Sequence, residues 1–372
     1  MRKMLGMEAA VRAKTTQLEG ISFVRDNGRS YGTIKATGNP DQQSLVSEYE
    51  IFRGDLAQIL FDLTKDNENI KYVFGEQVAS IQQQQNEKDD GPVTVEFAKG
   101  LPTAEYDLVV ACDGATSRTR ALGLGCGVRD HIKPMNSWAA FFSINQDLVE
   151  GSKVGQAYSA TGGRFIAIGS DPSGVNRVTL MEIHPPDDRD AMLPFRDAME
   201  QGDDALKQFI AHHFQGAGWK ANEVVKGMME AGPDGEFYAN EIVQVKTPSL
   251  HKGRFVLVGD AGYAPGPTGT GTTLAITGAY VLAGEVCRHK GNLAAGLRAY
   301  EEQMRPIIDD LQKVPLLVST ILAPQTAWGI WLRNHIFAFI VWTKTLEFAQ
   351  KFVANAFTST DKYGLLDYEW VA

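Results

Sequence analysis

The chain has 372 residues, 44% hydrophobic and 22% charged, which is the composition of a globular protein and excludes a chain that is disordered throughout. Its formal net charge of -9 argues against the clustered Lys and Arg side chains with which nucleic-acid-binding proteins neutralise phosphates. Its 3 cysteines are too few and too scattered for a disulfide framework or a structural zinc site. At about 150 residues per domain, the length predicts two or three domains.

The N-terminal part of the chain predicts a helix, a hairpin and a small antiparallel sheet. Residues 1–19 contain no turn former after Met7 and are expected to be helical. No signal peptide is expected, because Glu8 closes the short apolar run that follows the basic start. The Asp-Asn-Gly sequence at 26–28 separates two strand-like runs and is a strong hairpin signal. The remaining expectations are a helix over 55–63, an exposed loop over 82–91, and strands over 20–25, 31–35, 48–52, 70–74, 78–81 and 93–97.

Two short runs, residues 108–111 and 255–258, are apolar at every position. Such runs are typical of strands buried on both faces of a partly parallel sheet. Between them, apolar and polar residues alternate, as expected of strands in an antiparallel sheet. There we expect strands over 138–144, 164–168, 178–183 and 241–245 and a helix over 203–214. The prediction is therefore a mixed α/β fold: an α/β domain from 1–130 and 253–310, an inserted antiparallel-sheet domain over 131–252, and a C-terminal helical region over 311–372.

The first of the two apolar strands ends in a glycine turn. Asp113 and Gly114 follow it directly, and Ser117 is placed to cap a following helix. Because open α/β sheets bind ligands outside the carboxyl ends of their strands, Asp113 lies where a sugar hydroxyl or a phosphate-binding helix start would be. An ordinary tight turn with a capped helix would give the same pattern.

The second apolar strand leads into a more informative turn. Gly259 and Asp260 open a loop dense in Gly and Pro, which runs into a helix expected over 273–287. Glycines let the backbone approach a flat or phosphorylated ligand, and a helix N-terminus offers free N–H groups. Thr272 and Thr273 would supply those amides. Glycines at 278 and 284 inside the helix indicate close packing.

Three segments together resemble the class A flavoprotein monooxygenases, the para-hydroxybenzoate hydroxylase-like aromatic hydroxylases. They occur in the family's order, from Arg53 to about Cys287. They are Ile51-Phe52-Arg53-Gly54-Asp55-Leu56, then Asp113-Gly114-x-x-Ser117-x-x-Arg120, then Gly259-Asp260 with Pro267-x-Gly269-x-Gly271. The resemblance implies a Rossmann-like FAD/NAD(P)-binding domain with an inserted antiparallel-sheet substrate domain.

The resemblance also implies a reaction. FAD would be reduced by NAD(P)H and would react with O2 to form a flavin C4a-hydroperoxide that hydroxylates or epoxidises the substrate. The apolar residues of the inserted sheet suggest that this substrate is a hydrophobic small molecule, such as an aromatic polyketide or a terpenoid. The implied cofactor contacts are Arg53 on the flavin, Asp260 on ribityl or ribose hydroxyls, Asp113 at the opposite turn, and the backbone around Gly269, Gly271, Thr272 and Thr273 at the pyrimidine edge. No catalytic side chain and no metal site are assigned.

The sequence departs from this family at its N-terminal end. Members open with a βαβ unit whose Gly-x-Gly-x-x-Gly turn holds the FAD pyrophosphate, and no such unit is found here. The Gly-x-Gly-x-Gly run at 123–127 follows a predicted helix rather than a strand, so it is no substitute. We favour a shortened form of a longer enzyme. The alternative is a non-redox descendant that has lost tight FAD binding and acts as a binding protein or a cofactor-free isomerase or cyclase.

The inserted sheet should supply the wall of the substrate cavity. By alternation about half of its large apolar residues should face that cavity, and the candidates are Trp138, Phe141, Phe165, Met181, Phe237 and Tyr238. Arg164 and His184 are candidate polar contacts. Apolar runs at 314–332 and 336–342 are interrupted and too short for a firm membrane span. We expect a cytoplasmic protein with a buried or interfacial helix pair there, through which it would touch a membrane surface.

Overall fold

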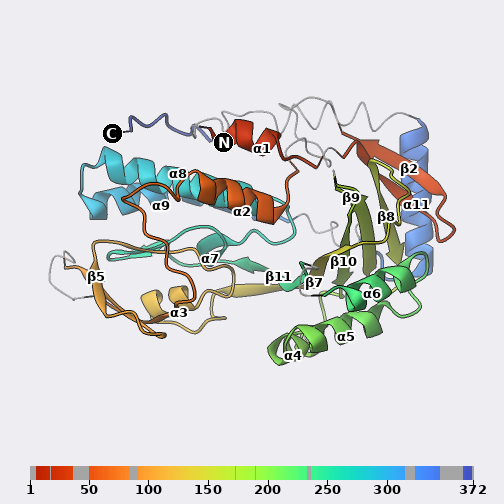
Figure 1. The fold of residues 1–372 in the computed structure, drawn as a ribbon, viewed down its shortest axis with the longest axis horizontal. Coiled ribbons are helices and arrows are strands. Elements are labelled where there is room, and N and C mark those ends of the chain that lie inside the picture. Colours follow the sequence, from red (N-terminus) through yellow and green to blue (C-terminus); the bar gives the residue numbers. More distant parts are fainter. Residues whose placement is uncertain are drawn as a thin grey trace.

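The computed structural model describes residues 6–16, 18–36, 50–83, 91–171, 173–188, 190–232, 236–314, 323–343 and 363–370. Figure 1 shows a large sheet at one end of the molecule and a group of helices over two small sheets at the other. The large sheet has seven strands in the order β11-β7-β10-β9-β8-β1-β2. These strands are β1 (Gly20–Val24), β2 (Ser30–Lys35), β7 (Ile132–Ile144), β8 (Val154–Ala160), β9 (Arg164–Ser170), β10 (Asn176–Ile183) and β11 (Tyr238–Val245).

The two faces of the large sheet differ. One face packs on three helices, α4 (Leu193–Gln201), α5 (Asp203–Phe214) and α6 (Ala221–Glu230). Trp138 is fully buried on this face and stacks on Phe195, with 5.3 Å between ring centroids. Phe141 and Tyr238 are paired neighbours on the other face and are 40% and 43% exposed. This exposed face is therefore available to a site, whereas the helix-covered face is core.

The other end of the molecule is built on two three-stranded sheets. In one, β6 (Val109–Ala111) pairs in parallel with β13 (Phe255–Leu257), which pairs with β12 (His251–Lys252). The second is the meander of β3 (Val78–Gln83), β4 (Val93–Phe97) and β5 (Ala104–Tyr106). The helices here are α1 (Met7–Arg12), α2 (Arg53–Asp62), α3 (Arg118–Leu124), α7 (Asp260–Tyr263), α8 (Gly271–Arg288) and α9 (Leu293–Leu311). A core of apolar side chains from α8, α9 and β13 holds this end together.

Most of the predicted elements are confirmed. The hairpin at 26–28, the two parallel strands, the four strands of the inserted sheet and the helices at 55–63, 203–214 and 273–287 are all present. Burial on both faces is confirmed for β13 but is wrong for β6, where Val110 is 40% exposed. The glycines inside α8 mark close packing as predicted, since a Cβ at Gly278 would lie 1.9 Å from the Tyr263 hydroxyl and one at Gly284 would lie 2.2 Å from the Tyr368 ring.

Three predicted elements need correction. The N-terminal helix ends at Arg12, well before residue 19. Residues 50–52 are not a strand, and 48–49 lie outside the described residues. Residues 70–74 are not a strand either, because no described strand lies beside this segment to form backbone hydrogen bonds with it. Phe74 is consequently 78% exposed.

The seven-stranded sheet draws its strands from two parts of the chain. The hairpin β1–β2 joins it through parallel pairing of β1 with β8, although residues 20–35 fall within the segment 1–130 assigned to the α/β domain. The domain boundaries stay a prediction. In the C-terminal region, α11 (Ala327–Trp342) packs along β2 and β8, at the right-hand end of the molecule in Figure 1. None of the described helices is both long enough and apolar enough to cross a membrane.

Parts of several predictions fall outside the described residues. They are residues 1–5 and 17 of the N-terminal helix, most of the loop at 82–91, residues 315–322 of the first C-terminal apolar run, and residues 344–362 and 371–372 of the C-terminal region.

Candidate functional site

The two glycine turns leave the small parallel sheet side by side. Ala111 at the end of β6 is paired with Leu257 at the end of β13, and the Val258 amide donates to the Ala111 carbonyl at 3.0 Å. The chain then turns sharply after each strand, with a positive φ of 86° at Gly114 and 67° at Gly259. Since both strands run in the same direction, both turns lie at one edge of the sheet, as the sequence predicted.

Arg120 joins the two turns. Its side chain is fully buried, and its Nη1 atom donates to the carbonyls of Ala115, at 2.9 Å, and Ala261, at 2.8 Å. Its Nη2 atom donates to the Val128 carbonyl at 2.7 Å. Burial lowers the pKa of Arg120, and the negative charge of Asp113 opposes that shift. The Arg120 guanidinium therefore fixes the turn after β6 and the turn after β13 relative to each other.

The Asp113 carboxylate is occupied within its own turn. One oxygen accepts a hydrogen bond from the Ser117 hydroxyl, and the other accepts one from the Thr119 amide at 3.0 Å. Ser117 in turn caps α3, because its hydroxyl oxygen accepts from the Arg120 amide at 2.7 Å. This is the geometry of a capped turn, the alternative that the sequence left open. The cofactor contact expected at Asp113 is not tested by these bonds, but they account for both carboxylate oxygens without a ligand.

Asp260 lies in a different environment from Asp113. It begins α7 beside the start of α8, where a Cβ at Gly271 would lie 3.6 Å from one of its carboxylate oxygens. Its side chain is exposed to solvent. Partial desolvation by the surrounding protein raises the pKa of Asp260, and the nearby positive charge of Arg53 opposes the rise.

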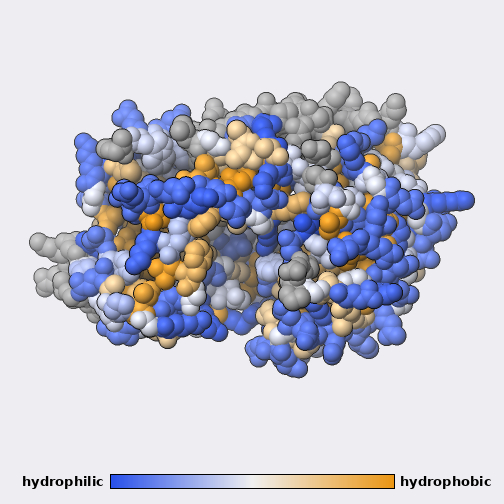
Figure 2. All heavy atoms as spheres, viewed as in Figure 1, coloured by the Kyte–Doolittle hydropathy of each residue, from blue (hydrophilic) through white to orange (hydrophobic). Residues whose placement is uncertain are grey.

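Arg53 connects this turn to the exposed face of the large sheet. It is the first residue of α2, and its Nη1 atom donates to the Tyr238 hydroxyl at 3.1 Å. The guanidinium also lies over the rings of Tyr238 and Phe141, at 5.2 and 6.0 Å from their centroids. A cation near aromatic faces is held by their quadrupoles as well as by hydrogen bonds. The bond between Arg53 and Tyr238 thus connects the two ends of the molecule. Figure 2 shows that the surface is hollowed between these two ends.

The loop before α8 ends in a helix start without a side-chain cap. Gly266 and Gly269 have φ of 78° and 72°, which favours glycine at both positions. Thr270 occupies the N-cap position, but its hydroxyl bonds to that of Thr268, at 2.7 Å, rather than to the helix amides. Thr272 and Thr273 are exposed in the first turn. The first amides of this 18-residue helix therefore carry a partial positive charge without a side-chain cap, next to Asp260.

Two buried glutamines that the sequence did not single out hold this loop in place. The Gln244 side chain, on β11, donates to the Pro265 carbonyl at 3.0 Å and to the Gln312 carbonyl at 2.7 Å. The Gln312 side chain donates to the carbonyls of Val245, at 2.8 Å, and Ala264, at 3.1 Å. The loop is thereby anchored both to the large sheet and to the end of α9. No motif marks either glutamine, because each bonds to backbone atoms that are distant in the sequence.

The candidate wall residues divide between the two faces of the sheet. Phe141, Phe165, Met181 and Tyr238 are on the face toward Arg53, by their pairing across β11, β7, β10 and β9. Trp138 and Phe237 are not wall residues, because both pack in the core under α4, α5 and α6.

The two candidate polar contacts lie on the helix side of the sheet. Arg164 donates to the His213 carbonyl at 2.9 Å, at the end of α5. His184 lies 3.9 Å from Glu182, which also contacts His213 at 2.8 Å. Both candidates are therefore structural rather than substrate contacts.

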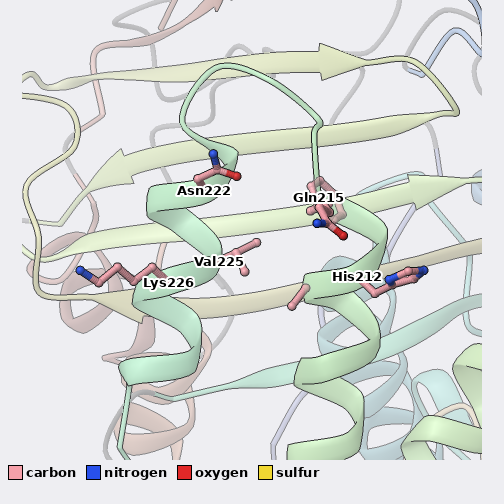
Figure 3. Close-up of a pocket in the computed structure, with 7 residues that line it drawn as sticks. His212, Gln215, Asn222, Val225 and Lys226 are labelled. Atoms are coloured by element: carbon pink, nitrogen blue, oxygen red, sulfur yellow. The ribbon is translucent and has the colours of Figure 1, made fainter.

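A groove on the surface lies away from this site. It has a volume of about 400 Å³ and opens between α5 and α6, with His212 and Lys226 extending to either side in Figure 3. The large sheet separates the groove from Arg53, because α5 and α6 cover the opposite face. Within the described ranges, no group of three or more His, Cys, Asp or Glu side chains is placed to hold a metal ion.

These features fit the flavin end of FAD. An uncapped helix start suits the electron-rich pyrimidine edge, a carboxylate beside it suits sugar-like hydroxyls, and the glycines with positive φ leave backbone open to a flat ring. The Gly-x-Gly-x-Gly run at 123–127 does not add a pyrophosphate site, since Gly125 is the left-handed C-cap of α3, as the sequence indicated.

Comparison with known proteins identifies the family. Residues 1–313 match the sequence model of the FAD binding domain. The match covers most of the chain, so the protein belongs to this family. With its relatives it is a class A flavoprotein monooxygenase, an oxidoreductase whose cofactor is FAD.

Individual relatives agree with this assignment. The chain is 32% identical to Monooxygenase CTB7 of Cercospora beticola, over 98% of this chain and 86% of that protein. It is 31% identical to the FAD-dependent monooxygenase asL4 of Sarocladium schorii, over 91% of this chain and 80% of that protein. Among solved structures, tetracycline destructase Tet(51) aligns with a TM-score of 0.71 and 27% identity, over 98% of this chain and 85% of that one. Klebsiella pneumoniae HpxO, complexed with FAD and uric acid, shares the fold, with a TM-score of 0.64 and 17% identity over 95% and 83% of the two chains.

Proposed function

We propose that this chain transfers one oxygen atom from O2 to a hydrophobic aromatic, polyketide or terpenoid small molecule, with NAD(P)H as the reductant. The observation that carries the proposal is the meeting of Arg53, Asp260 and the start of α8 with the aromatic face formed by Phe141 and Tyr238. The similarity to Tet(51), a tetracycline destructase by name, supports a polyketide-like substrate.

Each group in the site has a proposed task. Bound FAD would supply the redox chemistry and the activation of O2, as expected above for the family. The α8 amides of Gly271, Thr272 and Thr273 would hold negative charge at the pyrimidine edge, because fixed dipoles in a partly dry site stabilise charge without reorganisation. Arg53 would orient the flavin, and Asp260 would accept hydrogen bonds from its sugar-like hydroxyls.

The exposed sheet face would hold the substrate opposite these groups. Phe141, Tyr238, Phe165 and Met181 offer an apolar surface, and the Arg53 guanidinium lies over the Phe141 and Tyr238 rings. Ligand pockets of this type bind through apolar area and take orientation from a few polar groups. We therefore expect a flat apolar substrate carrying a phenolate or enolate oxygen.

The decisive experiment begins with the colour of the purified full chain. The expected result is flavin absorbance, release of FAD on denaturation, and NADH- or NADPH-dependent O2 consumption that rises with an aromatic polyketide and yields a product heavier by one oxygen atom. A colourless protein that does not bind added FAD, by fluorescence titration, would contradict the proposal. That outcome would favour the alternative, a non-redox binding protein, isomerase or cyclase.

A further inference from the structure

The outer face of α11 carries a continuous line of aromatic side chains. Trp328, Trp331, His335, Phe339 and Trp342 follow one another at intervals of three or four residues, so they share one side of the helix. We call these five residues the aromatic stripe. Its two tryptophans at the ends of the helix are 69% and 79% exposed, and Trp331 and Phe339 are 53% and 61% exposed. Large aromatic groups gathered in this way on a surface mark an interaction site.

The opposite face of α11 is already packed against the protein. The Phe337 ring lies edge-on to Phe23 of β1, with 5.0 Å between centroids. Arg333 donates to the Ser159 hydroxyl of β8 at 3.0 Å, and Asn334 is buried. Arg333 is the only Asp, Glu, Lys or Arg residue between 327 and 342, and it faces this inner side. The inner face of α11 is therefore packed on the protein, and the aromatic stripe is a separate outer face that carries no Asp, Glu, Lys or Arg side chain.

Cations flank the stripe at the β1–β2 hairpin. The Tyr31 ring lies edge-on to His335, with 5.8 Å between centroids, and the Arg25 guanidinium lies over Tyr31 at 4.3 Å. The Arg25 amide donates to the Arg29 carbonyl at 2.8 Å, which places the two arginines together at the hairpin turn. Asp26, the acid of this turn, is directed elsewhere and accepts from the Trp219 amide at 2.6 Å. Arg25 and Arg29 thus place two positive side chains on this hairpin, in a chain whose net charge is -9.

We propose that the aromatic stripe, with Arg25 and Arg29, docks the protein on the surface of a lipid bilayer. Tryptophan rings settle at the level of lipid headgroups, and arginines beside them reach the phosphates. A helix that presents one apolar face and lacks acidic residues lies in the plane of the interface rather than across the membrane. This mode agrees with the absence of a membrane-spanning helix among the described residues.

The docked orientation has a consequence for the site, and this step rests on the proposed function. Ser159, which Arg333 contacts, is paired with Phe165, so α11 covers one end of the exposed sheet face. The stripe and the substrate wall are thus on opposite sides of one helix. A substrate dissolved in the bilayer would reach the wall past α11 without crossing open water.

The test is binding of the full chain to lipid vesicles, followed by flotation and by tryptophan fluorescence with brominated lipids. Wild type should bind vesicles of phosphatidylcholine with 30% phosphatidylserine, on the order of tenfold more tightly than pure phosphatidylcholine, and salt should weaken the binding. Replacing three side chains together (Trp328→Ser, Trp331→Ser, Trp342→Ser) should reduce binding to both vesicles at least ~10-fold. Arg25→Gln with Arg29→Gln should remove most of the preference for the anionic lipid.

The matched control is Phe74→Ser, which removes an equally exposed aromatic residue far from α11 in the sequence, and it should leave vesicle binding unchanged. Circular dichroism and thermal melting report whether each variant folds. The proposal is overturned if folded wild type fails to bind either vesicle at millimolar lipid. It is equally overturned if the triple substitution leaves vesicle binding intact. A wild-type dimer that does not bind lipid, and that the triple substitution dissociates, would also overturn it, because the stripe would then bind a second copy of the chain. Flavin absorbance is measured on the same samples. A protein that contains FAD but does not bind vesicles would contradict the membrane proposal alone and would leave the proposed function intact.

Discussion

The two glycine turns begin alike and end differently. Each follows a short apolar strand of the same parallel sheet, and each carries an aspartate at the sheet edge. At Asp113 the carboxylate closes its own turn through Ser117 and Thr119. At Asp260 the carboxylate faces the start of α8 and Arg53. The first turn is therefore largely structural at its side chains, whereas the second keeps polar groups available to a ligand.

The largest effect is expected at Arg120, on which both turns depend. Arg120→Met would leave the carbonyls of Ala115, Val128 and Ala261 buried without a donor, so the free energy of unfolding should fall by about 3–5 kcal/mol. Arg118→Met on the exposed side of the same helix should change it by less than ~0.5 kcal/mol. Urea denaturation of both variants measures the difference. Equal stability of the two would show that the turns are held together by other contacts.

The next effect concerns pH and the tyrosine beneath the second turn. Burial raises the pKa of Tyr263 to about 12, and its hydroxyl lies 3.1 Å from that of Tyr300. The folded state thus keeps a proton that the unfolded state releases from about pH 10, so stability should fall as pH rises from 10 to 12. Tyr263→Phe should be less stable than wild type by about 1 kcal/mol near neutral pH, yet lose less on alkalinisation. Tyr106→Phe, at an exposed site, is the control; identical alkaline slopes for wild type and Tyr263→Phe would refute the assignment.

The third effect concerns the loop that leads from the second glycine turn to α8. Gln244→Leu removes the donor to the carbonyls of Pro265 and Gln312, which should cost about 1–3 kcal/mol of stability and loosen the loop that leads to α8. FAD affinity, measured by fluorescence titration, should therefore fall. Gln208→Leu on the exposed side of α5 is the matched control. Unchanged FAD affinity in folded Gln244→Leu would mean that the loop does not need this anchor.

The fourth effect tests the comparison most directly. Asp260→Asn should weaken FAD binding about tenfold, or about 1.4 kcal/mol, with little loss of stability. Asp113→Ala should do the reverse, lowering the free energy of unfolding by about 1 kcal/mol through the lost turn and cap bonds while changing FAD affinity little. Titration and denaturation of both variants are needed. If Asp113→Ala weakens FAD binding more than Asp260→Asn, the contrast between the turns is wrong.

Sequence patterns were sufficient where the physics is local. Continuous apolar runs identified the parallel strands, the Asp-Asn-Gly sequence identified the hairpin, and glycines at 278 and 284 identified close packing. Alternation predicted that half of the large residues on the inserted sheet would face a cavity. It could not say which half, because Trp138 and Phe141 are equally apolar and only the position of α4, α5 and α6 distinguishes the two faces.

Features that depend on distant contacts were not predictable. Gln244 and Gln312 are far apart in the sequence, and each bonds backbone carbonyls that no motif identifies. The segment 70–74 has the composition of a strand, but a strand also requires a neighbour, and composition does not report one. The hydrogen bonds of the Asp113 carboxylate to Ser117 and Thr119 likewise could not be predicted, because they depend on the rotamers of these side chains.

The segment from β7 to β11, which supplies five strands of the large sheet, begins and ends at adjacent points. The Lys246 amide donates to the His131 carbonyl at 2.9 Å, so the residue before β7 and the residue after β11 are neighbours. An insertion whose ends meet can change its length and side chains without moving what it is inserted into. Selection for a new substrate could therefore remodel the sheet face around Phe141 while leaving the cofactor cradle intact.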